Sequence, residues 1–265
     1  MDFYPSRIAY AAFAFVFISF PAAAQTSPSQ TGAIASIPTA PVLPASGAGA
    51  NWLYVWSGGS VTDSYNGAYI GAVAPFNGDL GTEGFALRWD FTGGRYSSSI
   101  FGTTTVPTRV DTDNAAFMVG YRKKDGDSWF SGYLGAATES HFNPDPTAPM
   151  RGTQFGVKAV ADYSTKLADK SIIYAMGSFA SPFTTGTLYA KYGYRAANQI
   201  LVGPETSFFG DKAYRESRVG AFIGFELPAE AGEIDISAGY VHPYTGSPDG
   251  YYANINFSVG LYRSK

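Results

Sequence analysis

The segment 251–261 constrains the fold of this chain more than any other, because its side chains alternate strictly in character. One set is apolar: Ala253, Ile255, Phe257, Val259 and Leu261. The interleaved set is small and polar: Asn254, Asn256, Ser258 and Gly260. Successive side chains of a β-strand point to opposite faces, so the segment predicts a strand with one apolar face. That face would form the core of a soluble sandwich, or would contact lipid in a transmembrane barrel whose polar face lines a lumen.

About twelve strand-like segments separated by turn signals follow one another from residue 51 onward, which favours an all-β fold. They are 51–60, 65–75, 84–97, 112–123, 128–141, 152–165, 170–181, 186–196, 199–209, 214–227, 233–242 and 250–262. Several show the same alternation, for example 85–91, 155–163 and 219–225. The segments 65–75 and 170–181 are too rich in small residues for their faces to be assigned.

The connections between these segments distinguish a barrel from a sandwich. In an outer-membrane barrel, short turns at one end alternate with longer loops at the other. Most even-numbered connections are tight, such as 124–127 and 197–198, whereas the odd-numbered ones include 96–111 and 142–151. The sequence therefore predicts an antiparallel transmembrane β-barrel of the outer membrane with about 12 strands, its long loops facing the exterior.

Charged residues fall in mid-strand on the face opposite the apolar one, and Glu205 joins them if its strand follows the same pattern. The predicted network consists of Arg88, Asp90, Lys158, Asp162, Lys191, Arg195, Glu205 and Arg218. A lysine or arginine on the lipid face near the midplane costs about 2–4 kcal/mol, so the set should point into the lumen. There it would form either a structural network that fills the lumen or a selectivity lining for a solute. We expect cations on the neighbouring strands to hold Glu205 ionised.

The N-terminal residues differ from the rest of the chain. Arg7, the apolar run 8–20 and the alanines at 22–24 form the pattern of a signal peptide, so residues 1–24 are expected to be removed on export. A retained anchor is the alternative, although the run is shorter than the roughly 20 residues of a membrane helix. Residues 25–50 are rich in Pro, Ser and Ala and carry no charge, which indicates a flexible leader. The leader could instead thread the lumen or reach a periplasmic partner. Residues 51–265 then form the barrel domain.

Composition excludes several functions. The chain has no cysteine, so neither a disulfide framework nor a thiolate metal site can form, and its formal charge of -3 gives no sign of a nucleic-acid partner. No phosphate-binding loop and no metal-ligand spacing is present, so no cofactor is expected. Histidine occurs at His141, beside Glu139 and Ser140, and at His242. Consecutive residues of a strand face opposite ways, so Glu139, Ser140 and His141 cannot form a triad, and the chain is not expected to be an enzyme.

The segments 192–195, 202–205 and 218–222 resemble the C-terminal half of the bacterial cellulose biosynthesis protein BcsS family, and Gly203-Pro204-Glu205 is the best single marker. Upstream, 77–80, 119–121 and 151–158 are also similar to that family's pattern, so the resemblance spans about 51–262. It implies an outer-membrane barrel that acts in cellulose production or export as a narrow channel or scaffold. The implied partners are outer-membrane lipid, a cellulose or glucan chain and other cellulose-synthesis components. It supplies no catalytic residues. A general porin-like or structural barrel, and a barrel enzyme acting on lipid or peptide, are the alternatives.

Overall fold

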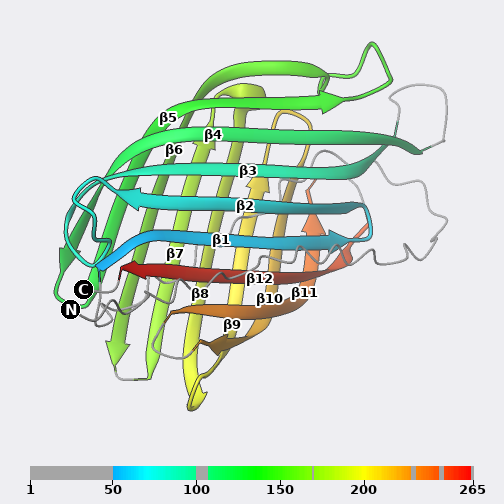
Figure 1. Cartoon of the computed structure of the whole chain (residues 1–265). Coiled ribbons are helices and arrows are strands. Elements are labelled where there is room, and N and C mark those ends of the chain that lie inside the picture. The colour runs from blue at the N-terminus through cyan, green and yellow to red at the C-terminus, as the bar shows by residue number, and fades with distance from the viewer. Residues whose placement is uncertain (1–49, 100–106, 169, 228–230, 245–247, 264–265) are drawn as a thin grey trace, which may run out of the picture.

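The protein is a closed barrel of twelve antiparallel strands. The computed structural model describes residues 50–99, 107–168, 170–227, 231–244 and 248–263. The strands are β1 (Ala50–Thr62), β2 (Tyr65–Pro75), β3 (Gly84–Ser99), β4 (Pro107–Asp125), β5 (Ser128–Phe142), β6 (Gly152–Ala168), β7 (Ser171–Ala180), β8 (Thr185–Ala197), β9 (Ile200–Gly210), β10 (Arg215–Glu226), β11 (Gly232–Pro243) and β12 (Gly250–Arg263). A short 3₁₀ helix, η1 (Pro182–Thr184), precedes β8. The predicted all-β fold and strand number are confirmed (Figure 1).

Each strand pairs with its neighbours in sequence, and β12 returns to pair with β1, which closes the sheet. Closure leaves no strand edge unpaired, so every strand has hydrogen-bonding partners on both sides. We call the end where β1 begins and β12 ends the proximal end, and the other end the distal end. The predicted signal peptide 1–24 and residues 25–49 of the leader lie outside the described residues, while Ala50 already belongs to β1.

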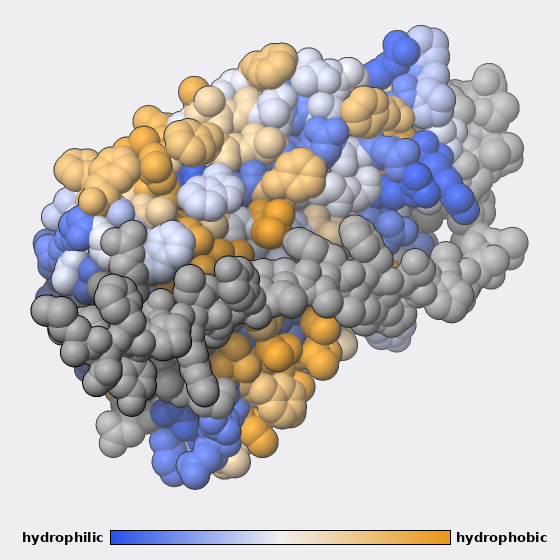
Figure 2. Space-filling model, viewed as in Figure 1, coloured by the Kyte–Doolittle hydropathy of each residue, from blue (hydrophilic) through white to orange (hydrophobic). Residues whose placement is uncertain are grey.

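The outer surface of the barrel wall is apolar. Large exposed side chains include Phe85, Leu134, Phe155, Leu188 and Ile223, with exposed fractions of 39–83%. Figure 2 shows apolar side chains gathered over the wall and hydrophilic ones toward the ends. The alternation predicted from the sequence therefore places its apolar set on the outside. Among the described residues, no helix is long and apolar enough to cross a membrane.

One predicted connection is shorter than the sequence suggested. Residues 96–111 were expected to form a long loop, but β3 and β4 continue into it, and Ser99 pairs with Pro107. Tyr96 lies opposite Val110, and both side chains are buried inside the barrel. Arg95 and Asp111 form a cross-strand ion pair of 2.6 Å on this extension. The sequence did not reveal these strand ends, because neither the serines at 97–99 nor the segment 107–111 has an alternating apolar pattern.

The lumen is filled by side chains. One cluster of buried apolar residues runs from β1 to β8 and includes Trp56, Met118, Tyr133 and Tyr174. A second cluster closes the distal end and joins residues of β2, β3, β4 and β9 to Met150 and to Phe183 of η1. The hydrophobic core of this protein therefore lies within the barrel, where side chains of opposite walls meet.

The connection between β2 and β3 covers part of the proximal end. Leu80 is 2% exposed and packs with the lumen cluster that contains Trp56. Its N–H donates to the carbonyl of Asn51 at 2.7 Å, and its carbonyl accepts a hydrogen bond from Arg122 at 2.7 Å. Both mouths of the barrel are thus narrowed by inserted side chains.

Candidate functional site

Four charged residues of β3 and β6 form a network across the lumen, which we call the quartet. Arg88 and Asp90 are two residues apart on β3 and so share the inner face. The Arg88 guanidinium donates to Asp90 at 3.1 Å and to Asp162 of β6 at 2.9 Å. The Lys158 ammonium donates to the other oxygen of Asp90 at 3.2 Å. The hydroxyl of Tyr174 donates to Asp162 at 3.0 Å, so every carboxylate of the quartet is paired and hydrogen-bonded.

A second cluster lies around Lys191 of β8. Its ammonium donates to Glu233 at 3.2 Å and to Asp235 at 3.0 Å, both on β11. The three side chains are 4%, 8% and 6% exposed. Asn256 of β12 donates to Asp235 at 3.4 Å and accepts a hydrogen bond from the hydroxyl of Tyr69. The single positive charge of Lys191 thus lies between two buried carboxyl groups, Glu233 and Asp235.

A third cluster lies around Arg218 of β10. The guanidinium donates to Glu216 at 2.7 Å and to the hydroxyl of Ser60 on β1 at 3.1 Å. It also lies 5.5 Å from the ring centre of Tyr252. Tyr214 donates its hydroxyl to the second oxygen of Glu216 at 2.9 Å. The cluster therefore ties β10 to β1, which are not neighbours in the sheet.

Glu205 does not have the partners that the sequence suggested. It lies opposite Lys191 in the β8–β9 register, but the cation is engaged with Glu233 and Asp235. Glu205 instead accepts hydrogen bonds from the hydroxyls of Tyr189 at 2.9 Å and Tyr252 at 2.8 Å. The cations that were expected to hold Glu205 ionised bind other carboxylates: Lys191 contacts Glu233 and Asp235, and Arg218 contacts Glu216.

The last predicted member, Arg195, lies near the proximal end of β8. Its guanidinium binds both carboxylate oxygens of Glu226 on β10, at 3.0 and 2.5 Å. The eight predicted residues thus all lie on the inner side of the wall, in separate clusters. Sequence reasoning missed their partners, namely Glu216, Glu226, Glu233 and Asp235. The spacing of two between Glu216 and Arg218, and between Glu233 and Asp235, was the available signal.

A histidine cluster lies near the distal end. His141 and Glu139 share the inner face of β5 and are joined by a 2.9 Å contact, while Tyr96 contacts the other ring nitrogen of His141 at 3.1 Å. Ser140 points the other way and contacts Thr153 at 3.0 Å. The predicted separation of Ser140 from Glu139 and His141 is therefore present in the structure. His242 lies at an exposed site, 2.7 Å from Asp249.

Asp211 lies beside this cluster, in the connection between β9 and β10. Burial is the largest influence on this carboxyl and raises its pKa to about 6. The backbone N–H groups of Ala213 and Tyr214 donate to one carboxylate oxygen and oppose the shift, as does nearby His141. The other oxygen has no hydrogen-bond partner among the described residues. Asp211 is therefore a group outside the strands whose charge changes at mildly acidic pH.

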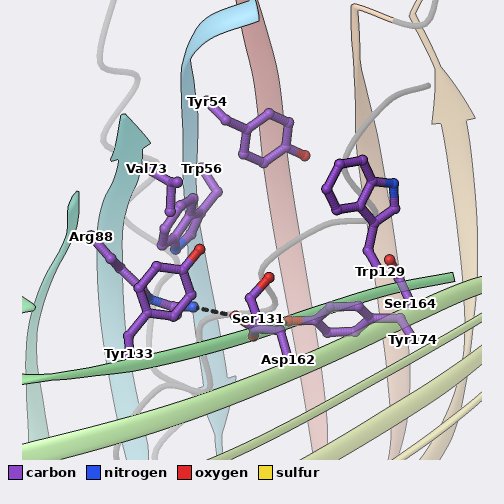
Figure 3. Close-up of a pocket in the computed structure, with 10 residues that line it drawn as sticks. All are labelled: Tyr54, Trp56, Val73, Arg88, Trp129, Ser131, Tyr133, Asp162, Ser164 and Tyr174. Carbon is purple, nitrogen blue, oxygen red and sulfur yellow. Dashed lines mark hydrogen bonds and ion pairs between the residues drawn. The ribbon is translucent and has the colours of Figure 1, made fainter. Parts of the chain in front are cut away.

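A cavity lies next to the quartet and is lined by ten residues (Figure 3). Five are aromatic: Tyr54, Trp56, Trp129, Tyr133 and Tyr174. Arg88 and Asp162 of the quartet contribute polar groups to the same wall. In the described part of the chain, no group of three or more His, Asp or Glu side chains could hold a metal ion.

The sequence of this chain matches the model of one protein family. The model of the family described as cellulose biosynthesis protein BcsS matches residues 54–261. No curated protein matches the sequence.

Several solved structures share the barrel shape. A KdgM porin is 10% identical with a TM-score of 0.49, covering 79% of this chain and 99% of its own. LpxR from Salmonella typhimurium is 11% identical with a TM-score of 0.48, covering 78% and 100%. The translocator domain of the autotransporter NalP from Neisseria meningitidis is 10% identical with a TM-score of 0.44, covering 83% and 91%. Scores at this level give no information on a shared ligand or activity.

Proposed function

Because the chain belongs to the cellulose biosynthesis protein BcsS family, we propose that it is an outer-membrane barrel that serves cellulose production as a scaffold with a closed lumen. The apolar outer wall supports a location in lipid, since exposed side chains such as Phe155 and Leu188 would otherwise contact water. We also propose that residues 1–24 are a signal peptide that directs export and is then removed. So are lipid, a glucan chain and other cellulose-synthesis components as partners.

The observation that carries the scaffold role is the set of polar links between strands that are not neighbours. Arg88 of β3 binds Asp162 of β6, and Lys191 of β8 binds Asp235 of β11. Tyr252 of β12 binds Glu205 of β9. Together with the apolar clusters, these links occupy the space through which a solute or glucan would have to pass. A narrow channel would require several of them to break.

Two measurements test this proposal. Deleting the gene should reduce exported cellulose while the synthase activity of isolated membranes stays unchanged, because a scaffold acts after polymerisation. The purified barrel in planar bilayers should give no stable conductance. A steady open current would favour the channel alternative, and unchanged export would contradict the role in cellulose production.

The proposal assigns no catalytic activity to the barrel. His141 and Glu139 face inward and contact each other, but the adjacent hydroxyl of Ser140 lies on the other face of β5. Nucleophilic catalysis needs the hydroxyl within hydrogen-bond reach of the base. Hydrolysis of lipid or peptide substrates that is lost in a His141→Ala, His242→Ala variant would contradict this assignment.

A further inference from the structure

Arg122 of β4 is a buried cation whose neighbouring carboxylates are engaged elsewhere. Its side chain lies inside the barrel wall, and the residue is 1% exposed. Asp79 and Asp162 are near enough to act on it electrostatically. However, Asp162 is bound to Arg88, and Asp79 accepts hydrogen bonds from backbone N–H groups. A buried charge without a bound partner is costly, so this guanidinium favours an anion beside it.

The unused donors of Arg122 lie along one edge of its guanidinium. Nη1 donates to the carbonyl of Leu80 at 2.7 Å, whereas Nε and Nη2 have no hydrogen-bond partner among the described residues. The Nε–H and one Nη2–H point in the same direction from the planar group and form a fork that can hold a single anion. Buried polar groups are nearly always hydrogen-bonded, so this fork requires an acceptor.

Space for a small acceptor lies beside Arg122. Ser131 is opposite Arg122 in the β4–β5 register, and the ring centre of Trp129 lies 4.6 Å from the guanidinium. Both Ser131 and Trp129 line the cavity next to the quartet (Figure 3). Its free volume of about 30 Å³ holds about one or two water-sized groups and is too small for an organic ligand. The cavity therefore selects a ligand by size.

The donors and charges around this cavity favour an anion over a water molecule. The quartet is neutral, because its two cations and two carboxylates pair with one another. Arg122 adds a positive charge that no ion pair within the described residues compensates. The indole N–H of Trp56, on the opposite wall, is a further donor without a partner in the described part of the chain. Water would satisfy the donors but would leave the charge.

From these observations we propose that the barrel binds a single chloride ion beside Arg122, held by the Nε–Nη2 fork. Chloride is a monatomic anion little larger than a water molecule, and it accepts several hydrogen bonds at once. Arg122 also holds Leu80, which covers part of the proximal end. The ion would therefore stabilise the closed form of that mouth. This site follows from the donors of the chain itself and does not depend on a role in cellulose production.

Thermal unfolding of the purified barrel in detergent tests the proposal, in sodium chloride and in sodium gluconate of the same ionic strength. Gluconate is too large for the cavity. Chloride should raise the wild-type melting temperature by about 5–10 °C when its concentration reaches about 100 times the dissociation constant. Arg122→Gln keeps a donor for the carbonyl of Leu80 but lacks the fork, so it should lose this rise. The matched control is Lys123→Gln, which should keep the rise because Lys123 is exposed.

Bromide provides a second readout in the wild-type protein, and it decides the question if Arg122→Gln does not fold. Crystals grown with bromide in place of chloride should show an anomalous peak within hydrogen-bond reach of Nε and Nη2 of Arg122. Any of three results would overturn the inference: equal wild-type melting temperatures in chloride and gluconate, the same chloride effect in a folded Arg122→Gln variant, or no bromide peak beside Arg122.

Discussion

Replacing Lys191 with methionine should strongly destabilise the barrel. The substitution shortens the side chain by one atom and removes its charge, which leaves Glu233 and Asp235 buried together without the cation that both contact, at 3.2 and 3.0 Å. Removing one partner of a buried ion pair typically costs about 3–5 kcal/mol. For a domain of this size, each kcal/mol lowers the melting temperature by about 2–4 °C, so we expect a loss of about 6–20 °C.

The assay is the temperature at which the purified barrel loses its compact gel mobility on heating. A triple variant, Lys191→Met with Glu233→Gln and Asp235→Asn, removes every charge of the cluster and should recover most of the loss, because neutral replacements of a buried ion pair are often tolerated. Lys212→Met is the control, since Lys212 is exposed outside the strands. An unchanged melting temperature in Lys191→Met, or a triple variant less stable than the single one, would refute the reasoning.

Four further outcomes are expected. Asp211→Asn should raise the melting temperature at pH 7 but change it little at pH 4. The pKa of the Asp211 carboxyl is raised to about 6 in the folded state, so ionising it as the pH rises from 4 to 7 costs the folded protein about 3 kcal/mol of stability. A difference between the two proteins that does not depend on pH would contradict this. Glu205→Ala leaves the hydroxyls of two tyrosines without their acceptor, which should lower the free energy of unfolding by about 1–3 kcal/mol for each hydroxyl. Glu205→Gln should cost about 1 kcal/mol. Equal melting temperatures in the wild-type protein and both variants would argue against these hydrogen bonds. Ile223→Arg on the outer face should cost about 2–4 kcal/mol if the residue lies near the bilayer midplane, and assembly as efficient as that of Ile223→Ala would contradict a lipid-facing position. In intact cells an impermeant thiol reagent should label Thr147→Cys at the distal end and not Asp127→Cys at the proximal end, and the opposite pattern would invert the proposed orientation.

The sequence could predict the strands because the alternation that defines them is local. Phe155, Val157 and their neighbours follow a period of two, and a pleated strand turns that period into two faces without reference to the rest of the chain. The same local rule placed Arg88 and Lys158 on the inner face. It failed at the ends of β3 and β4, where residues 97–99 are serines and 107–111 are Pro-Thr-Arg-Val-Asp. Neither stretch alternates, and only cross-strand pairing reveals the longer hairpin.

The sequence by itself thus determined the all-β class, the strand number and the inner face of the charges in clearly alternating strands, since all three follow from neighbouring residues. Only the tertiary structure decided which charges meet. Arg88 reaches Asp162, which is 74 residues away, and Lys191 reaches Asp235, which is 44 away. Such partners are set by the closure and register of the whole barrel, which bring together strands that are distant in sequence. For the same reason, Glu205 binds two tyrosines instead of the cation beside it, and the lumen is packed.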